Sequence, residues 1–209
     1  MTNHATAAVA EGHKHRDDTG SRMGMWLFLF TELFLFGGLF IVYAVYRFQH
    51  TEEFHLASRE LDTFVGTVNT IILLTSSLTV ALSITAIREG RKHLSMMFVG
   101  MTVMLALAFL VNKFFEWSHK FEVGLYPGSP DLVNKPPGEI LYFALYFVMT
   151  GLHALHVVIG MIVLLVVLVM IARGSVNQTS FVKLEAGGLY WHLVDVIWIF
   201  LFPLFYLLH

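Results

Sequence analysis

The chain has 209 residues, of which 56% are hydrophobic and 13% charged, and its formal net charge is −2. Soluble domains carry about 25% charged residues, so this composition excludes an ordinary soluble protein. The absence of cysteine excludes disulfides, iron–sulfur clusters and thiolate metal sites, and the small net charge gives no reason to expect a nucleic-acid partner.

Five apolar segments follow one another along the chain, over residues 24–46, 64–87, 95–117, 139–172 and 187–208. Each is long enough to cross a bilayer as a helix, which takes roughly 20 residues. We therefore predict an all-α fold, a polytopic membrane bundle of five transmembrane helices that forms a single domain over residues 23–209. Residues 1–22 are polar and lack an apolar core, which excludes a secretory signal peptide and predicts a disordered tail.

The basic residues predict the orientation of the bundle, because the side of a membrane protein richer in Lys and Arg faces the cytoplasm. The tail and the connections after the second and fourth spans share one side and carry eight basic residues, against four on the other side. We expect a cytoplasmic N-terminus and an external C-terminus. The connection after the third span holds prolines 127, 130, 136 and 137, which predict an ordered surface loop rather than a helix, with the fourth span starting after them.

Ionisable side chains within the spans are the candidate functional residues, because lipid disfavours them unless they face protein or water. Glu32 and Asp195 each lie eight residues from the predicted cytoplasmic start of their span, about 12 Å deep, so the two carboxyl groups could share a proton or meet a histidine. Two interpretations stay open: a proton-handling site, or a hydrogen-bond network that holds helices together. His192 lies three residues before Asp195 on the same helical face, where the carboxyl group can orient the imidazole or stabilise its cation.

Three further positions favour packing over chemistry. Glu116 follows Lys113 by three residues at the external end of the third span, where we expect an ion pair with a snorkelling lysine. His153 and His156 are expected to make helix-packing polar contacts next to Gly151 and Gly160, which allow close helix approach. Two bis-histidine haems would need four ligands, and the spans hold three histidines. The residues alone predict no catalytic residue, cofactor site or metal site in this chain.

Several motifs resemble subunit III of haem–copper respiratory oxidases. Residues 190–200 (YWHLVDVIWIF) are similar to the signature of the last helix in that family, and residues 150–160 (TGLHALHVVIG) to the motif of the penultimate helix. Glu32, in the segment WLFLFTE, matches the family's carboxylate in the corresponding helix. The segments VNTIILLTSS (68–77) and FFEW (114–117) fit the intervening helices. The resemblance runs in matching order from about residue 22 to the end of the chain.

The resemblance implies a non-redox subunit. The family's subunit III packs on catalytic subunit I, in a complex with subunit II, stabilises it and supports proton uptake during oxygen reduction. Haem and copper are then expected in the partner subunits, and none in this chain. Glu32, His192 and Asp195 would belong to the buried polar interior and Glu116 to the outer end. The chain itself would not be catalytic.

The sequence is similar to the five-helix form of the family, found in bacterial oxidases. The seven-helix form has two further N-terminal helices, which create a lipid-filled cleft; here a polar tail stands in their place. The similarity implies a multi-pass protein of the bacterial inner membrane, with a structural phospholipid among its cofactors and with membrane lipids as neighbours.

Other functions remain open at this stage. The most similar are a quinol oxidase subunit III and an accessory protein of nitric oxide reductase, because other subunits select the electron donor. A stand-alone proton-coupled transporter would use Glu32 and Asp195 as carriers, although five spans without an internal repeat do not divide into the equal halves common in transporters. A haem-binding membrane anchor is disfavoured by the number of histidines.

Overall fold

The computed structural model describes residues 3–208, with side chains from Gly20 onward. Within this part the chain is helical and has no β-strand, which confirms the predicted all-α class. Five helices have the length and apolar composition to cross a membrane, as predicted. The helices are α1 (Asn3–Gln49), α2 (Thr51–Ser58), α3 (Thr63–Arg88), α4 (Lys92–Glu122), α5 (Pro130–Val133), α6 (Pro137–Ala172) and α7 (Val182–Tyr206).

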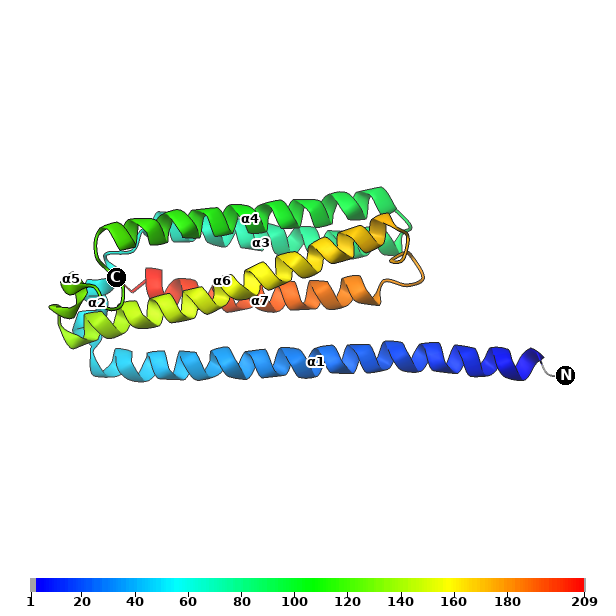
Figure 1. Cartoon of the computed structure of the whole chain (residues 1–209), viewed down its shortest axis with the longest axis horizontal. Coiled ribbons are helices and arrows are strands. Elements are labelled where there is room, and N and C mark those ends of the chain that lie inside the picture. The colour runs from blue at the N-terminus through cyan, green and yellow to red at the C-terminus, as the bar shows by residue number, and fades with distance from the viewer. Residues whose placement is uncertain (1–2, 209) are drawn as a thin grey trace.

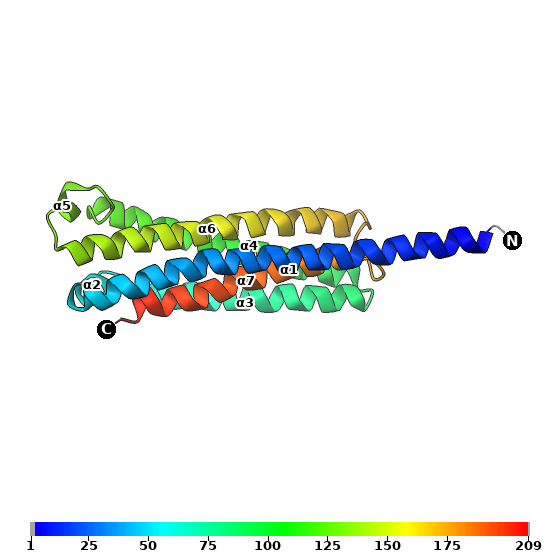
Figure 2. The ribbon, with the colours of Figure 1, turned by 90° about the horizontal axis from the view of Figure 1, so that it is seen from below.

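The five long helices run side by side along one axis (Figures 1 and 2). The α3–α4 and α6–α7 connections lie together at one end, which we call the basic end after the arginines and lysines of these segments. The short helices α2 and α5 and the C-terminal end of α7 lie at the opposite end. Helix α1 projects past the basic end of the bundle.

The span of α1 begins at Gly20, but the helix itself begins at Asn3. Its backbone therefore stays helical through most of the segment in which the sequence favours a disordered tail. The physical reason is that this segment contains several alanines and no proline, so a helix nucleated in the apolar span can propagate backwards at little cost per residue.

Local signals explain the other helix boundaries. The side chain of Asp62 caps α3 by accepting from the backbone N–H of Phe64 at 2.8 Å. Gly90 takes a left-handed conformation, with φ of +77°, in the turn that follows α3. Helix α6 begins at Pro137, as the prolines predict. The preceding loop differs from the prediction in one respect: Ser129 caps a single helical turn, α5, by accepting from the N–H of Leu132 at 3.1 Å.

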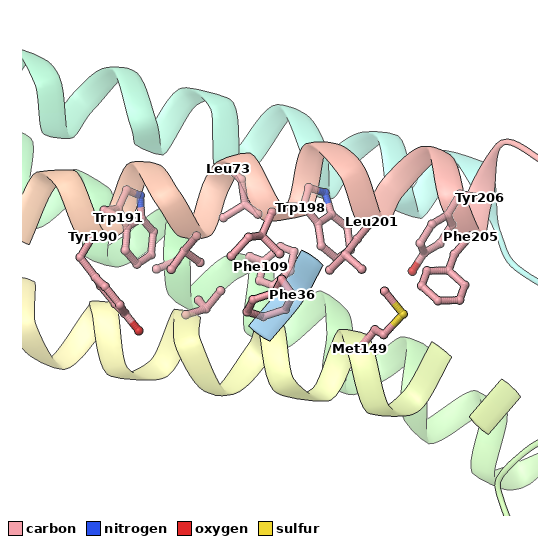
Figure 3. Close-up of a cluster of buried hydrophobic side chains, with 14 of the residues drawn as sticks. Phe36, Leu73, Phe109, Met149, Tyr190, Trp191, Trp198, Leu201, Phe205 and Tyr206 are labelled. Atoms are coloured by element: carbon pink, nitrogen blue, oxygen red, sulfur yellow. The ribbon is translucent and has the colours of Figure 1, made fainter. Parts of the chain in front are cut away.

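The core lies between α3, α4, α6 and α7 and is dominated by aromatic side chains (Figure 3). Trp191 and Trp198 of α7 are completely buried. At Gly160 of α6, a Cβ atom would lie 2.9 Å from the ring of Trp191, so the glycine permits the close approach of α6 and α7. Gly151 instead faces Trp117, at an ordinary contact distance of 3.4 Å.

Helix α1 packs far less tightly than the others, since only 11% of its apolar window is buried. Phe36 is the phenylalanine of α1 that is fully buried, whereas Phe28, Phe30 and Phe34 are exposed on the surface of the bundle. In a membrane these exposed rings face lipid or another subunit. Apolar surface provides no driving force between helices in lipid, so the position of α1 depends on specific contacts.

Candidate buried polar site

The first polar contact within the membrane joins α1 to α6. Glu32 Oε2 lies 2.9 Å from His156 Nε2, and His156 Nδ1 lies 2.7 Å from the backbone oxygen of Leu152. A carbonyl oxygen only accepts, so Nδ1 carries a proton. The Glu32–His156 bond then contains either a neutral carboxylic acid that donates to Nε2 or an imidazolium that donates to a carboxylate. In both states one proton lies between the two residues, and its removal breaks the contact.

The partner of Glu32 is therefore a histidine of α6 and not the carboxyl group of Asp195. His156 was expected to make a helix-packing contact, and it does so by forming this pair. Both carboxyl groups lie further from the start of their helix than expected and still at matching positions, because Asp195 is thirteen residues from Val182 and Glu32 is twelve residues from Gly20, about 18–20 Å in each case. An equal depth alone did not bring the two carboxyl groups together.

The second set of contacts joins α3 to α7. The indole N–H of Trp191 donates to Ser76 Oγ at 3.0 Å, and that of Trp198 donates to Thr70 Oγ1 at 3.0 Å. Between them, His192 Nδ1 lies 2.7 Å from Ser77 Oγ. The hydroxyl groups of α3 thus satisfy the polar edges of the aromatic residues of α7, which would otherwise be unpaired in an apolar core.

Asp195 is the exception on this face. It is 3% exposed, and neither carboxyl oxygen has a hydrogen bond of standard geometry to any described residue. His192 is three residues away on the same helix but bonds to Ser77 instead. Asp195 therefore does not orient the imidazole of His192. The hydroxyl group of Ser77 is the hydrogen-bond partner of that ring instead.

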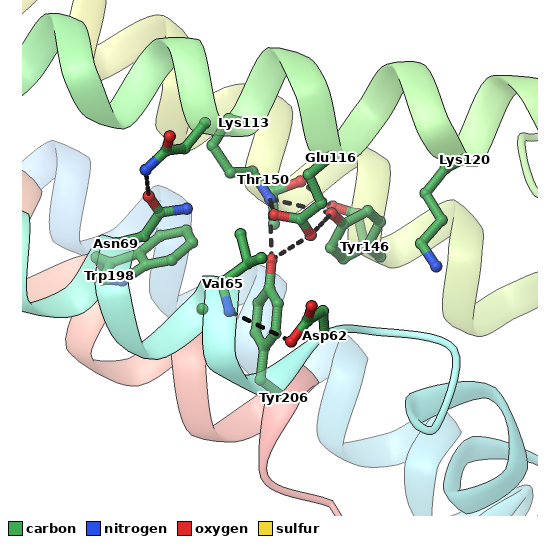
Figure 4. A network of polar contacts seen from close by, with 12 residues as sticks. Asp62, Val65, Asn69, Lys113, Glu116, Lys120, Tyr146, Thr150, Trp198 and Tyr206 are labelled. Carbon is green, nitrogen blue, oxygen red and sulfur yellow. Dashed lines mark hydrogen bonds and ion pairs between the residues drawn. The ribbon is translucent and has the colours of Figure 1, made fainter.

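The third set lies near the opposite end and joins α4, α6 and α7 (Figure 4). Lys113 Nζ donates to Glu116 Oε2 at 3.2 Å and to the hydroxyl groups of Tyr146 and Tyr206 at 3.0 Å each. Both tyrosines donate in turn to Glu116 Oε1 at 2.5 Å. All three N–H groups of the lysine are used, and both carboxylate oxygens accept.

This network corrects the expected role of Lys113. The lysine does not snorkel, since the side chains of Lys113 and Glu116 are only 3% and 6% exposed. Four aromatic rings surround its ammonium group within 6 Å, those of Trp117, Tyr146, Trp198 and Tyr206. Neither tyrosine was among the residues expected at a functional site. For Tyr146 a signal existed, because it lies seven residues before His153 and so on the same face of α6.

His153 belongs to none of these networks. It is fully buried, and neither ring nitrogen has a hydrogen bond to a described residue. Its ring packs against Phe109 and Trp198, with centroid distances of 5.6 and 5.2 Å. The packing contact expected of His153 is therefore aromatic rather than polar. Across the described residues, no three His, Asp or Glu side chains converge as metal ligands.

Comparison with known proteins supplies the family. Residues 3–209 match the family described as cytochrome c oxidase subunit III. A protein from Synechocystis sp., "Cytochrome c oxidase subunit 3", is 34% identical over 206 residues, which cover 98% of this chain and 83% of that protein. "Probable quinol oxidase subunit 3" from Staphylococcus haemolyticus is 30% identical, over 90% of this chain and 89% of its own length.

A third relative is much longer. "Heme-copper oxidase subunit I+III" from Aeropyrum pernix is 31% identical over 89% of this chain, and the matching part is 22% of that protein. The family match over residues 3–209 includes the spans that carry Glu32, His156, His192 and Asp195. The chain therefore belongs to the cytochrome c oxidase subunit III family.

Proposed function

We propose that this chain is the non-redox subunit III of a haem–copper terminal oxidase, which stabilises catalytic subunit I and supports its proton uptake during oxygen reduction. The observation that carries the proposal is the family match over residues 3–209. The name of the Aeropyrum pernix relative, subunit I+III, supports subunit I as the partner. Subunit II is the second partner in this proposal. The haem and copper of the complex are expected in the partner subunits and not in this chain.

The surface of α1 fits a subunit that is held by others. Its exposed phenylalanines form an apolar face that the bundle leaves uncovered, and this face is available to subunit I or to lipid. The polar groups, in contrast, lie inside the bundle and between helices of this chain. The Glu32–His156 pair is the group best suited to support proton uptake, because one proton is held between its two members.

A mild-detergent pull-down of the tagged chain from its native membranes, with a reduced-minus-oxidised haem spectrum, tests the proposal. We expect a large partner subunit and a haem signal that purify with the chain. A stable, monodisperse and haem-free chain without partners would refute the proposal and favour the proton-coupled transporter. A lone chain with haem would favour the haem-binding anchor.

For the electron donor, we propose cytochrome c rather than quinol. The Synechocystis relative, named as a cytochrome c oxidase subunit, is 34% identical, against 30% for the Staphylococcus quinol oxidase subunit. Oxygen consumption by the purified complex with reduced cytochrome c or with quinol tests this choice. Turnover with quinol alone would refute it, and reduction of nitric oxide instead of oxygen would favour the nitric oxide reductase accessory protein.

We propose further that the chain is a multi-pass protein of the bacterial inner membrane and that its basic end faces the cytoplasm. The basic residues support this orientation. The chain has no native cysteine, so Ser175→Cys at the basic end and Glu122→Cys at the opposite end give clean labelling sites. We expect an impermeant thiol reagent to label the Glu122→Cys variant in intact cells from outside; labelling of Ser175→Cys instead would reverse the topology.

A structural phospholipid is the one non-protein component that we propose for this chain. A groove of about 390 Å³ opens between α1, α3 and α7 at the basic end, lined by Arg22, Arg88 and Trp26 among others. Both arginines pair with Glu185, which leaves an excess of one positive charge among the described side chains beside an apolar groove and suits an anionic headgroup. Lipid analysis of the purified complex, with Arg88→Gln as the variant, tests this proposal.

A further inference from the structure

Asp195 is the buried ionisable group that the contacts described above leave without a role. Asp195 lies at the middle of α7 and is 3% exposed. No described side chain or backbone group forms a hydrogen bond of standard geometry with its carboxyl group. A carboxylate in this position would be a bare charge in an apolar core, which costs several kcal/mol. The neutral acid avoids most of that cost, so a route by which a proton can reach or leave the buried carboxyl group would control its charge.

Ser77 of α3 is the polar group that lies against both Asp195 and His192. Its hydroxyl is 2.7 Å from His192 Nδ1. Asp195 follows His192 by three residues, one turn along the same face of α7, so its carboxyl group is the next polar group on the face that Ser77 contacts, although no hydrogen bond of standard geometry joins them. A serine hydroxyl has one proton to donate and lone pairs with which to accept. Ser77 can therefore accept from one of these residues and donate to the other.

His192 connects this pair to the surface of the bundle. It is partly exposed and lines the groove at the basic end, together with Arg22, Arg88 and Glu185. It also lines the apolar continuation of this groove along α1 and α7. The other carboxyl group at this depth, Glu32, is bonded to His156 and is not part of the path.

We propose that His192, Ser77 and Asp195 form a proton-exchange branch from the groove at the basic end to the buried carboxyl group of Asp195. A proton from the solvent at the basic end, beside the lipid headgroup proposed for the groove, reaches Nε2 of His192, and the proton on Nδ1 passes to Ser77 Oγ. The hydroxyl proton of Ser77 passes at the same time to an oxygen of Asp195. His192 is left neutral, Ser77 is unchanged, and the carboxylate of Asp195 has become a carboxylic acid. The reverse sequence releases the proton.

Only the biological purpose of this branch rests on the proposed function: in an oxidase it would supply a proton store beside the uptake path. The exchange itself is a property of this chain. Failure to purify with haem-containing partners would remove the purpose, whereas the exchange is measured on the purified full-length chain or on its complex by a different signal.

The test is infrared spectroscopy of the purified protein in lipid after transfer from H2O to D2O. The carbonyl stretching band of a protonated Asp195 is identified by its absence in Asp195→Asn. Should that variant not fold, carbon-13 labelling of aspartate identifies the band in the unaltered chain, since the other aspartates with described side chains, Asp62 and Asp131, are exposed.

We expect Ser77→Ala to slow the isotope exchange of this band by about 100-fold, the lower range for the loss of a positioned proton donor. His192→Phe should slow it to a similar extent. The control is Ser83→Ala, because Ser83 is a buried serine of the same helix that donates to the backbone oxygen of Val80 instead. An Asp195 without a protonated band, or exchange in Ser77→Ala as fast as in the control, would overturn the proposal.

Discussion

Removal of Glu116 should be among the most destabilising single changes in the bundle. In Glu116→Ala the ammonium group of Lys113 stays in place, 3% exposed, without its counter-ion. Tyr146 and Tyr206 lose the oxygen to which both donate. The change thus leaves one charge and two hydroxyl groups unsatisfied, all within the core between α4, α6 and α7.

The expected loss in the free energy of unfolding is about 3–5 kcal/mol, as for other buried ion pairs from which one partner is removed. Replacement of both charged residues, in Lys113→Met with Glu116→Leu, removes the stranded charge. The two hydroxyl groups can then bond to each other, so the double variant should be less destabilised than Glu116→Ala alone, by about 2 kcal/mol. Such a recovery would identify the unpaired ammonium group as the main cost.

Unfolding by a denaturing detergent, followed by tryptophan fluorescence, measures both values. Trp117 and Trp198 are suitable reporters, because their rings lie 5.9 and 5.6 Å from Lys113 Nζ. The control is Glu139→Ala, which breaks the more exposed Lys135–Glu139 pair and should cost only about 0.5 kcal/mol. If Glu116→Ala costs no more than the control, or if the double variant is the less stable one, the reasoning is refuted.

Three other predictions concern the membrane interior. Glu32→Gln keeps the shape of the side chain but removes its acidic proton, so proton uptake by the complex should slow; unaltered uptake would rule out a proton role for Glu32. Gly160→Ala should cost about 1–3 kcal/mol through overlap with Trp191, whereas Gly37→Ala, with no atom within 4 Å of the new Cβ, should be neutral or stabilising. Asp195→Asn should leave complex yield and the free energy of unfolding within about 1 kcal/mol of the native values, because no hydrogen bond is lost; a collapse in yield would reveal a partner outside this chain.

The five spans could be predicted from the sequence because a membrane helix is defined by its own length and apolarity. The side chains of each segment alone decide whether it can cross a bilayer. The short helices α2 and α5 were missed for the opposite reason. They are one or two turns long, and their formation depends on local caps such as Ser129 rather than on a long apolar pattern.

The partners of the buried polar residues could not be predicted, because they depend on how each helix is rotated about its axis. Helix rise placed Glu32 and Asp195 at comparable depths, but rotation directs Glu32 towards His156 of α6. The i, i+3 spacing of His192 and Asp195 likewise suggested a pair, whereas Ser77 of α3 forms the stronger contact. Lys113 and Glu116 do pair as the spacing indicates, since both lie on one helix.

The loose attachment of α1 has a consequence for the order in which the protein is made. From Gly20 onward, where its side chains are described, three polar contacts hold this helix to later ones: Arg22 to Glu185, Glu32 to His156, and the Tyr43 hydroxyl to the backbone oxygen of Leu204. Each partner is at least 124 residues further along the chain. The first span to enter the membrane therefore lacks these partners at first. Glu32 stays without His156 until α6 has been synthesised, and Arg22 and Tyr43 stay without their partners until α7 has been synthesised. The polar attachment of α1 is therefore completed only after α7 has been made, and a chain truncated before α7 keeps, of these three contacts, only that between Glu32 and His156.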